Sequence, residues 1–276
     1  MTDDLGDRMK RYEAQETARR LLPELPIYAR IDGHGFSRFT RGMNRPYDDR
    51  MSWAMVSATR VLVERTHATV GYVQSDEISL VWLPREGGQA WFDGKVMKLT
   101  SILAGLASSA FMVAIAQEFD PNTGSSLWAQ MPHFDARVIN LPSSTEAANM
   151  LLWRNLDATK NAVSMAASHY YSHQELQNKS GAEKQEMLFE KNVNFNDYPS
   201  FFKRGTFVRR STEQRIFTPD ELERIPGQHR PQPGESVVRS RIQIFDLPPL
   251  NRISNRVETL FDGAEPLPNE PKGNEK

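Results

Sequence analysis

Residues 27–36 of the chain read IYARIDGHGF, a short apolar run that ends in an aspartate and a glycine-rich turn. The spacing predicts a buried strand over Ile27–Ile31 that places Asp32 at its carboxyl end. Glycines beside a carboxylate let main-chain groups approach a ligand closely, so Asp32 and Gly33 could hold a metal ion together with a phosphate. An Asp-Gly pair also forms ordinary turns, and the residues alone leave both interpretations open.

A second acidic motif lies in residues 70–83, which are rich in β-branched and aromatic side chains and are interrupted by QSDE at 74–77. This pattern predicts a hairpin with an acidic tip. If the hairpin and the first strand are neighbours in one sheet, Asp32 and Asp76 converge on one edge. Two carboxylates and a carbonyl suit Mg²⁺, and a pair of such ions about 3.5–4 Å apart serves phosphoryl transfer. The alternative is that Asp76 and Glu77 only cap the hairpin.

The composition is that of a folded globular protein, with 276 residues of which 39% are hydrophobic and 25% charged. The absence of cysteine excludes disulfides, thiolate zinc sites, iron–sulfur clusters and cysteine nucleophiles, so any metal must bind carboxylates, histidines or carbonyls. A formal net charge of −1 supplies no global attraction to RNA, so an RNA-binding surface needs locally concentrated basic groups. The charged N-terminus and the short apolar stretch 102–115 predict a cytoplasmic protein with no membrane partner.

The rest of the pattern predicts further helices and strands. Helices are expected over residues 8–22, from Asp48 to about Val63, and over 95–117, 144–177 and 182–191, and strands over 137–141, 206–211 and 237–245. From Asp262 onward the chain is rich in proline and charge, which predicts a disordered tail over 262–276.

Several segments resemble the motifs of a known family, the tRNA-His guanylyltransferases. YARIDGHGFSRFT (28–40), RPYDDRM (45–51) and YVQSDEISLVWLP (72–84) are similar to its IDGRGF, KPND and QSDE motifs. FDGKVMKLTSILAGLASSAF, FDARVINLPS, EKQEMLF and FFKRGT resemble its later landmarks, so the likeness runs from about residue 27 to 211. The resemblance implies an α+β fold with a polymerase- or cyclase-like palm domain, an antiparallel sheet with helices on one face, and a helical and basic C-terminal part. We expect the palm and its associated helices over 1–211 and an extension with strands over 212–261.

The resemblance also implies a tRNA 5′-end nucleotidyltransferase that works in the 3′–5′ direction. ATP would first activate the 5′ phosphate, and the 3′ hydroxyl of GTP or another nucleoside triphosphate would then attack it. Asp32, Asp76 and Glu77 would be catalytic, and two Mg²⁺ ions would be held by Asp32, the Gly33 carbonyl and Asp76. The implied nucleotide-binding residues are Asp32, Gly33, His34, Gly35, Phe36, Ser37, Ser75, Asp76, Lys95 and Lys98. The expected RNA-binding residues are Lys184, Lys203, Arg204, Arg209 and Arg210.

The chain departs from the family pattern in ways that indicate a branch. His34 stands where the family has arginine, and Thr159 and Ala162 stand where its HINNLYN motif has histidine and a second asparagine. The departures at Thr159 and Ala162 are similar to the guanylyltransferase-like branch, which resembles a template-directed repair polymerase. The neutral imidazole of His34 would weaken a phosphate contact made by the family's arginine. Arg154 and Asp157 match family positions, yet they could equally form an ordinary helix pair. The family resemblance further implies a homotetramer.

Two other functions fit parts of the sequence. A palm-type nucleotide cyclase shares the two-metal carboxylate geometry, although it lacks the C-terminal RNA-end motifs. A nucleotide- or RNA-binding protein whose catalysis has decayed would explain the altered residues, whereas the retention of Asp32, Asp76 and Glu77 argues against it.

Overall fold

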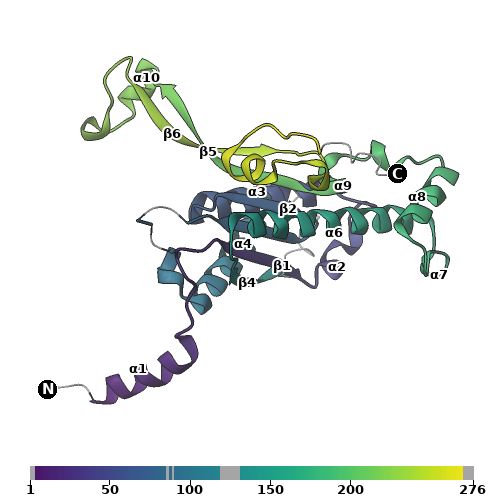
Figure 1. Cartoon of the computed structure of the whole chain (residues 1–276), viewed down its shortest axis with the longest axis horizontal. Coiled ribbons are helices and arrows are strands. Elements are labelled where there is room, and N and C mark those ends of the chain that lie inside the picture. The colour runs from purple at the N-terminus through teal and green to yellow at the C-terminus, as the bar shows by residue number, and fades with distance from the viewer. Residues whose placement is uncertain (1–3, 85–86, 89, 119–130, 270–276) are drawn as a thin grey trace, which may run out of the picture.

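A computed structural model of the chain describes residues 4–84, 87–88, 90–118 and 131–269 (Figure 1). Within these residues, one antiparallel sheet of six strands has the order β4-β1-β3-β2-β5-β6. The strands are β1 (Ile27–His34), β2 (Val70–Gln74), β3 (Glu77–Trp82), β4 (His133–Asn140), β5 (Thr206–Ile216) and β6 (Ser236–Phe245). The helices are α1 (Asp4–Thr17), α2 (Phe36–Phe39), α3 (Asp49–Thr66), α4 (Val96–Glu118), α6 (Ser144–Tyr170), α7 (His173–Leu176), α8 (Gly181–Glu190), α9 (Ser200–Arg204) and α10 (Pro219–Glu223).

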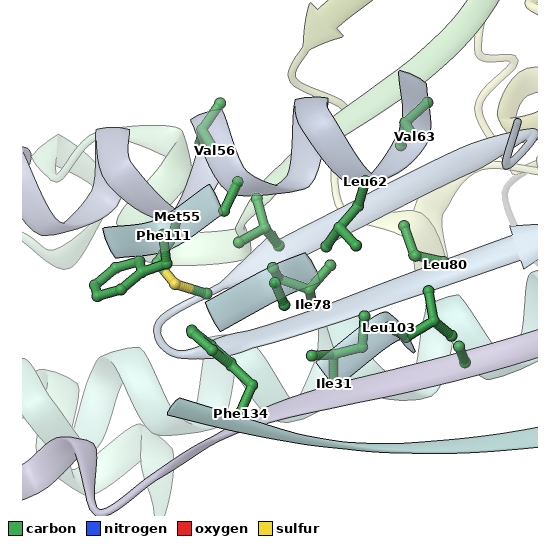
Figure 2. Packing of buried hydrophobic residues seen from close by; sticks show 14 of the residues in the cluster. Ile31, Met55, Val56, Leu62, Val63, Ile78, Leu80, Leu103, Phe111 and Phe134 are labelled. Carbon is green, nitrogen blue, oxygen red and sulfur yellow. The ribbon is translucent and has the colours of Figure 1, made fainter. Parts of the chain in front are cut away.

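Helices α3 and α4 cover one face of the sheet. Successive side chains of a strand point to opposite faces, so β1 and β3 direct one set of apolar residues toward these helices. Figure 2 shows this core, with Ile31, Ile78 and Leu80 from the strands, Met55 and Leu62 from α3, Leu103 and Phe111 from α4, and Phe134 from β4. The strands expected at the two acidic motifs and the helix expected after Asp48 are confirmed.

Helix α6 covers the opposite face of the sheet. There Tyr28, Val81 and Phe207 from the strands pack in one core with Ala148 and Leu151 of α6. The α+β fold with an antiparallel palm-like sheet is therefore confirmed. The expected placement of all helices on one face is wrong, because small alanine side chains let α6 lie close against the second face.

Strands β5 and β6 continue past the other strands as a two-stranded arm, which also carries α10 (Figure 1). The last β5 residue paired with β2 is Arg209, whereas β5 remains paired with β6 as far as Ile216. The strand expected to end at Ser211 thus crosses the boundary expected between the palm and its extension. The start of the extension is part of the same sheet.

The segment after β6 returns to the second face. Leu250, Leu260 and Phe261 are buried with the residues beneath α6. The amide of Ser254 donates to the Leu267 carbonyl at 2.9 Å, which ties the following residues to this segment. The disorder expected from Asp262 is therefore wrong for residues 262–269, while residues 270–276 lie outside the described residues.

Helix α4 is the one described helix that is long and apolar enough, by length and composition, to cross a membrane, over Val96–Gln117. Of the 18 residues in its most apolar stretch, 33% are buried inside the protein. Leu103 and Phe111 belong to the core that α4 forms with α3 and β4. The absence of a membrane partner stays a prediction.

The buried carboxylate of Asp48 caps helix α3 and forms an ion pair with Arg50, whose side chain is 42% exposed. The carboxylate accepts hydrogen bonds from the amide of Arg50 at 3.0 Å and from Nη2 of Arg50 at 2.7 Å, and only 5% of Asp48 is exposed. The hydrogen bond from Arg50 lowers the pKa of Asp48 from 3.8 to about 2, although burial opposes this shift. The pair therefore stabilises the start of α3 only while Asp48 is ionised.

The variant Asp48→Asn is expected to show the contribution of this charge. Because the folded pKa lies below the unfolded pKa, the stabilisation is fully present above about pH 4 and is lost as the pH falls toward about 2. Asparagine still caps a helix, so the variant should lower the free energy of unfolding by about 2 kcal/mol at neutral pH and by much less near pH 2. Urea denaturation at both pH values measures this, and an equal loss at both would contradict it.

Candidate active site

The ends of β1 and β3 bring the two acidic motifs together. Asp32 is paired with Glu77 across the antiparallel ladder, and the amide of Gly33 donates to the Asp76 carbonyl at 3.0 Å. Ser75 adopts a left-handed conformation, with φ 53°, in the turn between β2 and β3. The structure thus places Asp32 and Asp76 at one edge of the sheet, as the spacing predicts.

Both carboxylates line a pocket of 710 Å³ between this edge and α6. The sheet side of the pocket carries acidic groups, and the remaining walls carry basic and polar groups. The lining residues are Asp32, Gln74, Ser75, Asp76 and Glu77, then Arg45 and Pro46 before α3, and Arg154, Asn161, Ser164, Met165, Ser168 and His169 of α6. This mixture suits a phosphate-bearing substrate that is bound together with a cation.

Gly33 and Gly35 shape the main chain beside Asp32. A Cβ atom on Gly33 would lie 2.4 Å from the ring of Phe36, which packs against Phe111 and Phe134. Gly35 has φ 68°, a left-handed conformation at the start of α2. Any larger residue at position 33 would displace the aromatic cluster that supports this end of β1.

The two carboxylates form a donor set that fits Mg²⁺. Burial raises the pKa of Asp76, and the negative charge of Asp32 raises it further, although hydrogen bonds from the backbone and Ser75 oppose this. Among the residues that the structure describes, no group of three His, Asp or Glu side chains is placed to hold a metal. Mg²⁺ often takes one or two protein carboxylates and completes its shell with water and substrate phosphates. Asp32, Asp76 and the Gly33 carbonyl fit that pattern.

The variant Asp76→Asn is expected to stabilise the metal-free protein. Because the folded pKa of Asp76 is raised, the ionised carboxylate destabilises the fold at neutral pH, and this effect disappears as the pH falls below the folded pKa. Removing the charge should raise the melting temperature in EDTA. In proteins approaching this size, each kcal/mol gained in the free energy of unfolding corresponds to about 2–4 °C. Melting curves in EDTA at neutral pH and at pH 4 test this, and a lower melting temperature at neutral pH would contradict it.

Glu77 is held by arginine. Nε of Arg154 donates to Oε1 of Glu77 at 2.6 Å and Nη2 donates to Oε2 at 2.8 Å, and the two side chains are 13% and 15% exposed. Nε of Arg30 lies 3.9 Å from Oε2, and the Trp153 ring lies 4.7 Å from the Arg154 guanidinium carbon. Burial raises the pKa of Glu77, and the hydrogen bonds from Arg154 oppose this. Both oxygens of Glu77 are therefore bound by Arg154, and the catalytic role expected of Glu77 stays a prediction.

Sequence reasoning missed this role for Arg154. The expected helix pair is present, with Nη1 of Arg154 3.1 Å from Oδ2 of Asp157. The two shorter hydrogen bonds of Arg154 go to Glu77 on strand β3. The matching of Arg154 to a family position was the one available signal.

Strands β1 and β4 place residues of the same type opposite each other beside the carboxylates. The register pairs Arg30 with Arg137 and Asp32 with Asp135, and it pairs His34 with His133, whose rings stack at 5.0 Å. Like charges directly opposite each other destabilise a sheet, and here they are offset by Arg137, which pairs with Asp135 at 3.2 Å, and by Arg30, which lies 3.9 Å from Glu77. Sequence reasoning missed Arg137, because a strand pattern alone does not reveal its cross-strand partner.

A second pocket of 290 Å³, called here the side pocket, adjoins the first. The two share Arg45, Pro46, Gln74, Ser75, Asp76 and Met165. Its other walls are mainly apolar and aromatic, with a few hydroxyl groups. They comprise Phe36, Ser37, Thr40, Met43, Asn44, Tyr47, Asp48, Met51, Ser52, Phe201 and Phe202. The expected nucleotide-binding residues Phe36, Ser37 and Ser75 therefore do lie beside the carboxylates.

Lys95 and Lys98 lie at the other end of the sheet. Leu99, one residue beyond Lys98, lines a separate cavity of 220 Å³ together with Ile27 at the start of β1. Ile27 and Asp32 are five steps apart along β1, which corresponds to about 17 Å at roughly 3.3 Å per residue. The structure therefore places Lys95 and Lys98 away from the carboxylates, and the nucleotide-binding role expected of them stays a prediction.

The residues expected to contact RNA do not form one surface. Lys184 donates from Nζ to Oγ of Ser164 at 3.0 Å, which places it beside the main pocket. On α9, Lys203 donates to the Asn196 carbonyl, and Arg204 donates from Nη2 to a serine hydroxyl at 3.1 Å.

Arg209 and Arg210 are neighbours in β5, so their side chains point to opposite faces of the sheet. Nη1 of Arg209 donates to the Thr259 carbonyl at 3.0 Å, whereas Nη2 of Arg210 donates to the Glu64 carbonyl at the end of α3 at 2.8 Å. Arg209 and Arg210 therefore do not share one surface, and Lys184 is the member of the set that lies beside the main pocket. The RNA-binding role expected of the five residues stays a prediction.

Comparisons with known proteins agree with this geometry. The family described as tRNAHis guanylyltransferase (Thg1) matches residues 6–142. The tRNA(His) guanylyltransferase of Schizosaccharomyces pombe is 30% identical over 228 residues, which cover 77% of this chain and 83% of that protein. The fold is similar to a bacterial tRNA(His) guanylyltransferase (Thg1)-like protein in complex with ATP, with a TM-score of 0.69, 33% identity and coverage of 75% of this chain and 88% of that one. It is also similar to a complex of such a protein with GTP, with a TM-score of 0.67, 27% identity and coverage of 90% and 94%.

Proposed function

Because this chain belongs to the tRNA(His) guanylyltransferase family of nucleotidyltransferases, we propose that it adds nucleotides to the 5′ end of tRNA in the 3′–5′ direction. The observation that carries the proposal is the convergence of Asp32 and Asp76 in a pocket of 710 Å³ whose other walls are basic and polar. The similar bacterial structures are complexes with ATP and with GTP, which supports nucleoside triphosphates as substrates.

The proposed reaction has two phosphoryl-transfer steps. In the first, an oxygen of the RNA 5′ phosphate attacks the α-phosphorus of ATP, and pyrophosphate leaves. In the second, the 3′ hydroxyl of a nucleoside triphosphate attacks the activated 5′ phosphorus, its proton passes to solvent, and AMP leaves. Both steps are substitutions at a phosphorus atom, and each can take place beside the same carboxylates. One site can therefore serve both.

Asp32, Asp76 and the Gly33 carbonyl would hold Mg²⁺, in agreement with their donor chemistry. Two such ions supply charge neutralisation for the attacking and the leaving oxygens. Arg154 and Arg30 keep the Glu77 carboxylate oriented beneath the site. Arg45 and Lys184 add positive charge beside the main pocket, and the aromatic side pocket offers apolar walls for the base of the triphosphate.

The same face of the sheet offers room for the RNA. Arg137 lies beside Arg30 across the ladder, and its side chain is 53% exposed. Two guanidinium groups in adjacent strands match phosphate groups well. We assign RNA phosphates to Arg137 in place of Arg209 and Arg210, because Arg30 is only 20% exposed and lies against Glu77.

The choice of nucleotide is expected to follow base pairing with the opposite strand. Ala162 is fully buried against α8 and α9, and the hydroxyl of Thr159 donates to the Asn155 carbonyl at 3.1 Å. Neither side chain offers a free polar group for a guanine-specific contact. A paired base would instead orient the 3′ hydroxyl for attack, and orientation contributes several kcal/mol to catalysis.

The assay uses a 5′-truncated tRNA whose opposing nucleotide is varied through all four bases, with each labelled nucleoside triphosphate supplied singly. Addition that follows the opposing base supports the proposal. Guanosine added regardless of that base would show a dedicated guanylyltransferase, cyclic nucleotide would show a cyclase, and binding without turnover would show decayed catalysis.

A further inference from the structure

Trp53 on α3 is an exposed indole without a partner. The residue is 56% exposed, and no hydrogen bond or ring contact to it is present in the described part of the chain. By contrast, Trp82 donates from Nε1 to the Thr66 carbonyl at 2.9 Å, Trp91 lies 4.4 Å from the Phe92 ring, and Trp153 stacks with Arg154. Buried or partnered surroundings are usual for tryptophan, so the position of Trp53 indicates a ligand.

Trp53 stands at a groove of 350 Å³ between α3, α9 and the end of β6, called here the Trp53 groove. Its volume lies within the range of small-ligand pockets, about 300–1,000 Å³. It is lined by Ser52, Trp53, Val56, Phe201, Thr206, Ile244, Phe245 and Asp246. The one charged side chain is acidic, so the groove does not attract a phosphate.

The polar groups of the groove suit the edge of a base. The Asp246 carboxylate is exposed and accepts no hydrogen bond within the described ranges. A carboxylate accepts from the amino or imino groups of a nucleobase, and an indole stacks on the base face. Flat aromatic faces and a free acceptor therefore match an unpaired base.

The Trp53 groove borders the side pocket, and the side pocket borders the main pocket. The groove shares Ser52 and Phe201 with the side pocket, and the side pocket shares Arg45 and Asp76 with the main pocket. A nucleic acid strand bound at the carboxylates would therefore have the groove within reach of its neighbouring nucleotides. This proximity favours RNA over an unrelated protein as the occupant.

We propose that the Trp53 groove binds an unpaired nucleotide of the RNA substrate, on the 3′ strand beyond the base pair at the reacting 5′ end. The proposal rests on the proposed function, because it assigns part of the same substrate. Trp53 stacks on the base, Phe201 forms the inner wall, and Asp246 accepts a hydrogen bond from the base edge.

The test uses the full chain and two RNA hairpins with 5′ phosphates, one blunt and one with three unpaired nucleotides at its 3′ end. Fluorescence anisotropy measures binding, and 2-aminopurine in the unpaired segment reports stacking. Trp53→Ala should weaken binding of the tailed hairpin about 5- to 150-fold, the effect of one lost base–aromatic stack, and leave the blunt hairpin unchanged. Trp53→Phe should retain most of the preference. Tyr12→Ala removes an equally exposed aromatic residue, 56%, from α1 and should change neither.

Several outcomes would overturn the assignment. Equal binding of both hairpins by the wild type, or an unchanged preference and unchanged 2-aminopurine signal in Trp53→Ala, would exclude a base in the groove. A change of mass in light scattering without a change in RNA binding would assign the groove to a second copy of the chain. If nucleotide addition persists in those cases, the proposed function stands without the groove. If the wild type neither binds nor extends any RNA, the proposed function itself fails.

Discussion

Replacement of Asp32 or Asp76 by alanine is expected to abolish nucleotide addition while the fold remains intact. The two side chains lie at one edge of the sheet, where the Gly33 amide is bonded to the Asp76 carbonyl at 3.0 Å. Each carboxylate would hold ions that neutralise both reacting oxygens, so the loss of either removes several kcal/mol of transition-state stabilisation. This corresponds to a rate lower by about 10³-fold or more.

The double variant should be no slower than either single variant, because both residues are proposed to serve the same ions. Single-turnover addition of labelled nucleotide at several Mg²⁺ concentrations measures this. Asp220→Ala, which removes an exposed carboxylate from α10 on the arm, is the matched control. Near-normal turnover of Asp76→Ala at saturating Mg²⁺ would exclude the metal assignment.

The variant Arg154→Ala is expected to be the most destabilising of the site variants. It leaves the Glu77 carboxylate, 15% exposed, without its two hydrogen bonds. Breaking a buried pair in this way costs about 3–5 kcal/mol. Glu77→Gln should cost only about 1 kcal/mol, because burial raises the pKa of Glu77 and a neutral amide avoids that desolvation.

Urea denaturation of the two single variants and of Arg154→Met with Glu77→Gln measures the coupling. The double variant should recover most of the stability lost in Arg154→Ala, yet nucleotide addition should remain impaired in all three. Equal destabilisation by Glu77→Gln and Arg154→Ala would show that the pair does not behave as a buried charge and its counter-ion. Normal activity of Glu77→Gln would remove Glu77 from the site.

The local order of the chain was readable from the sequence. The strand that ends at Asp32, the hairpin around Asp76 and the capped start of α3 each rest on neighbouring residues, whose apolar period and turn chemistry act over a few positions. The convergence of the two carboxylates followed from one assumption, that these strands adjoin. The register of β1 and β3 makes that assumption correct.

Neighbouring residues specify where the strands beside Asp32 and Asp76 end, and the motifs they form carry the family resemblance. Folding in three dimensions brings Arg154 to Glu77 and Arg137 beside Arg30. It also separates Lys95 and Lys98 from the carboxylates and places Trp53 at a groove that borders the side pocket. These relations join residues distant along the chain, and they depend on strand register and on the face that each helix covers. Local spacing carries no information about either, because both are set by contacts between segments that are far apart in the sequence.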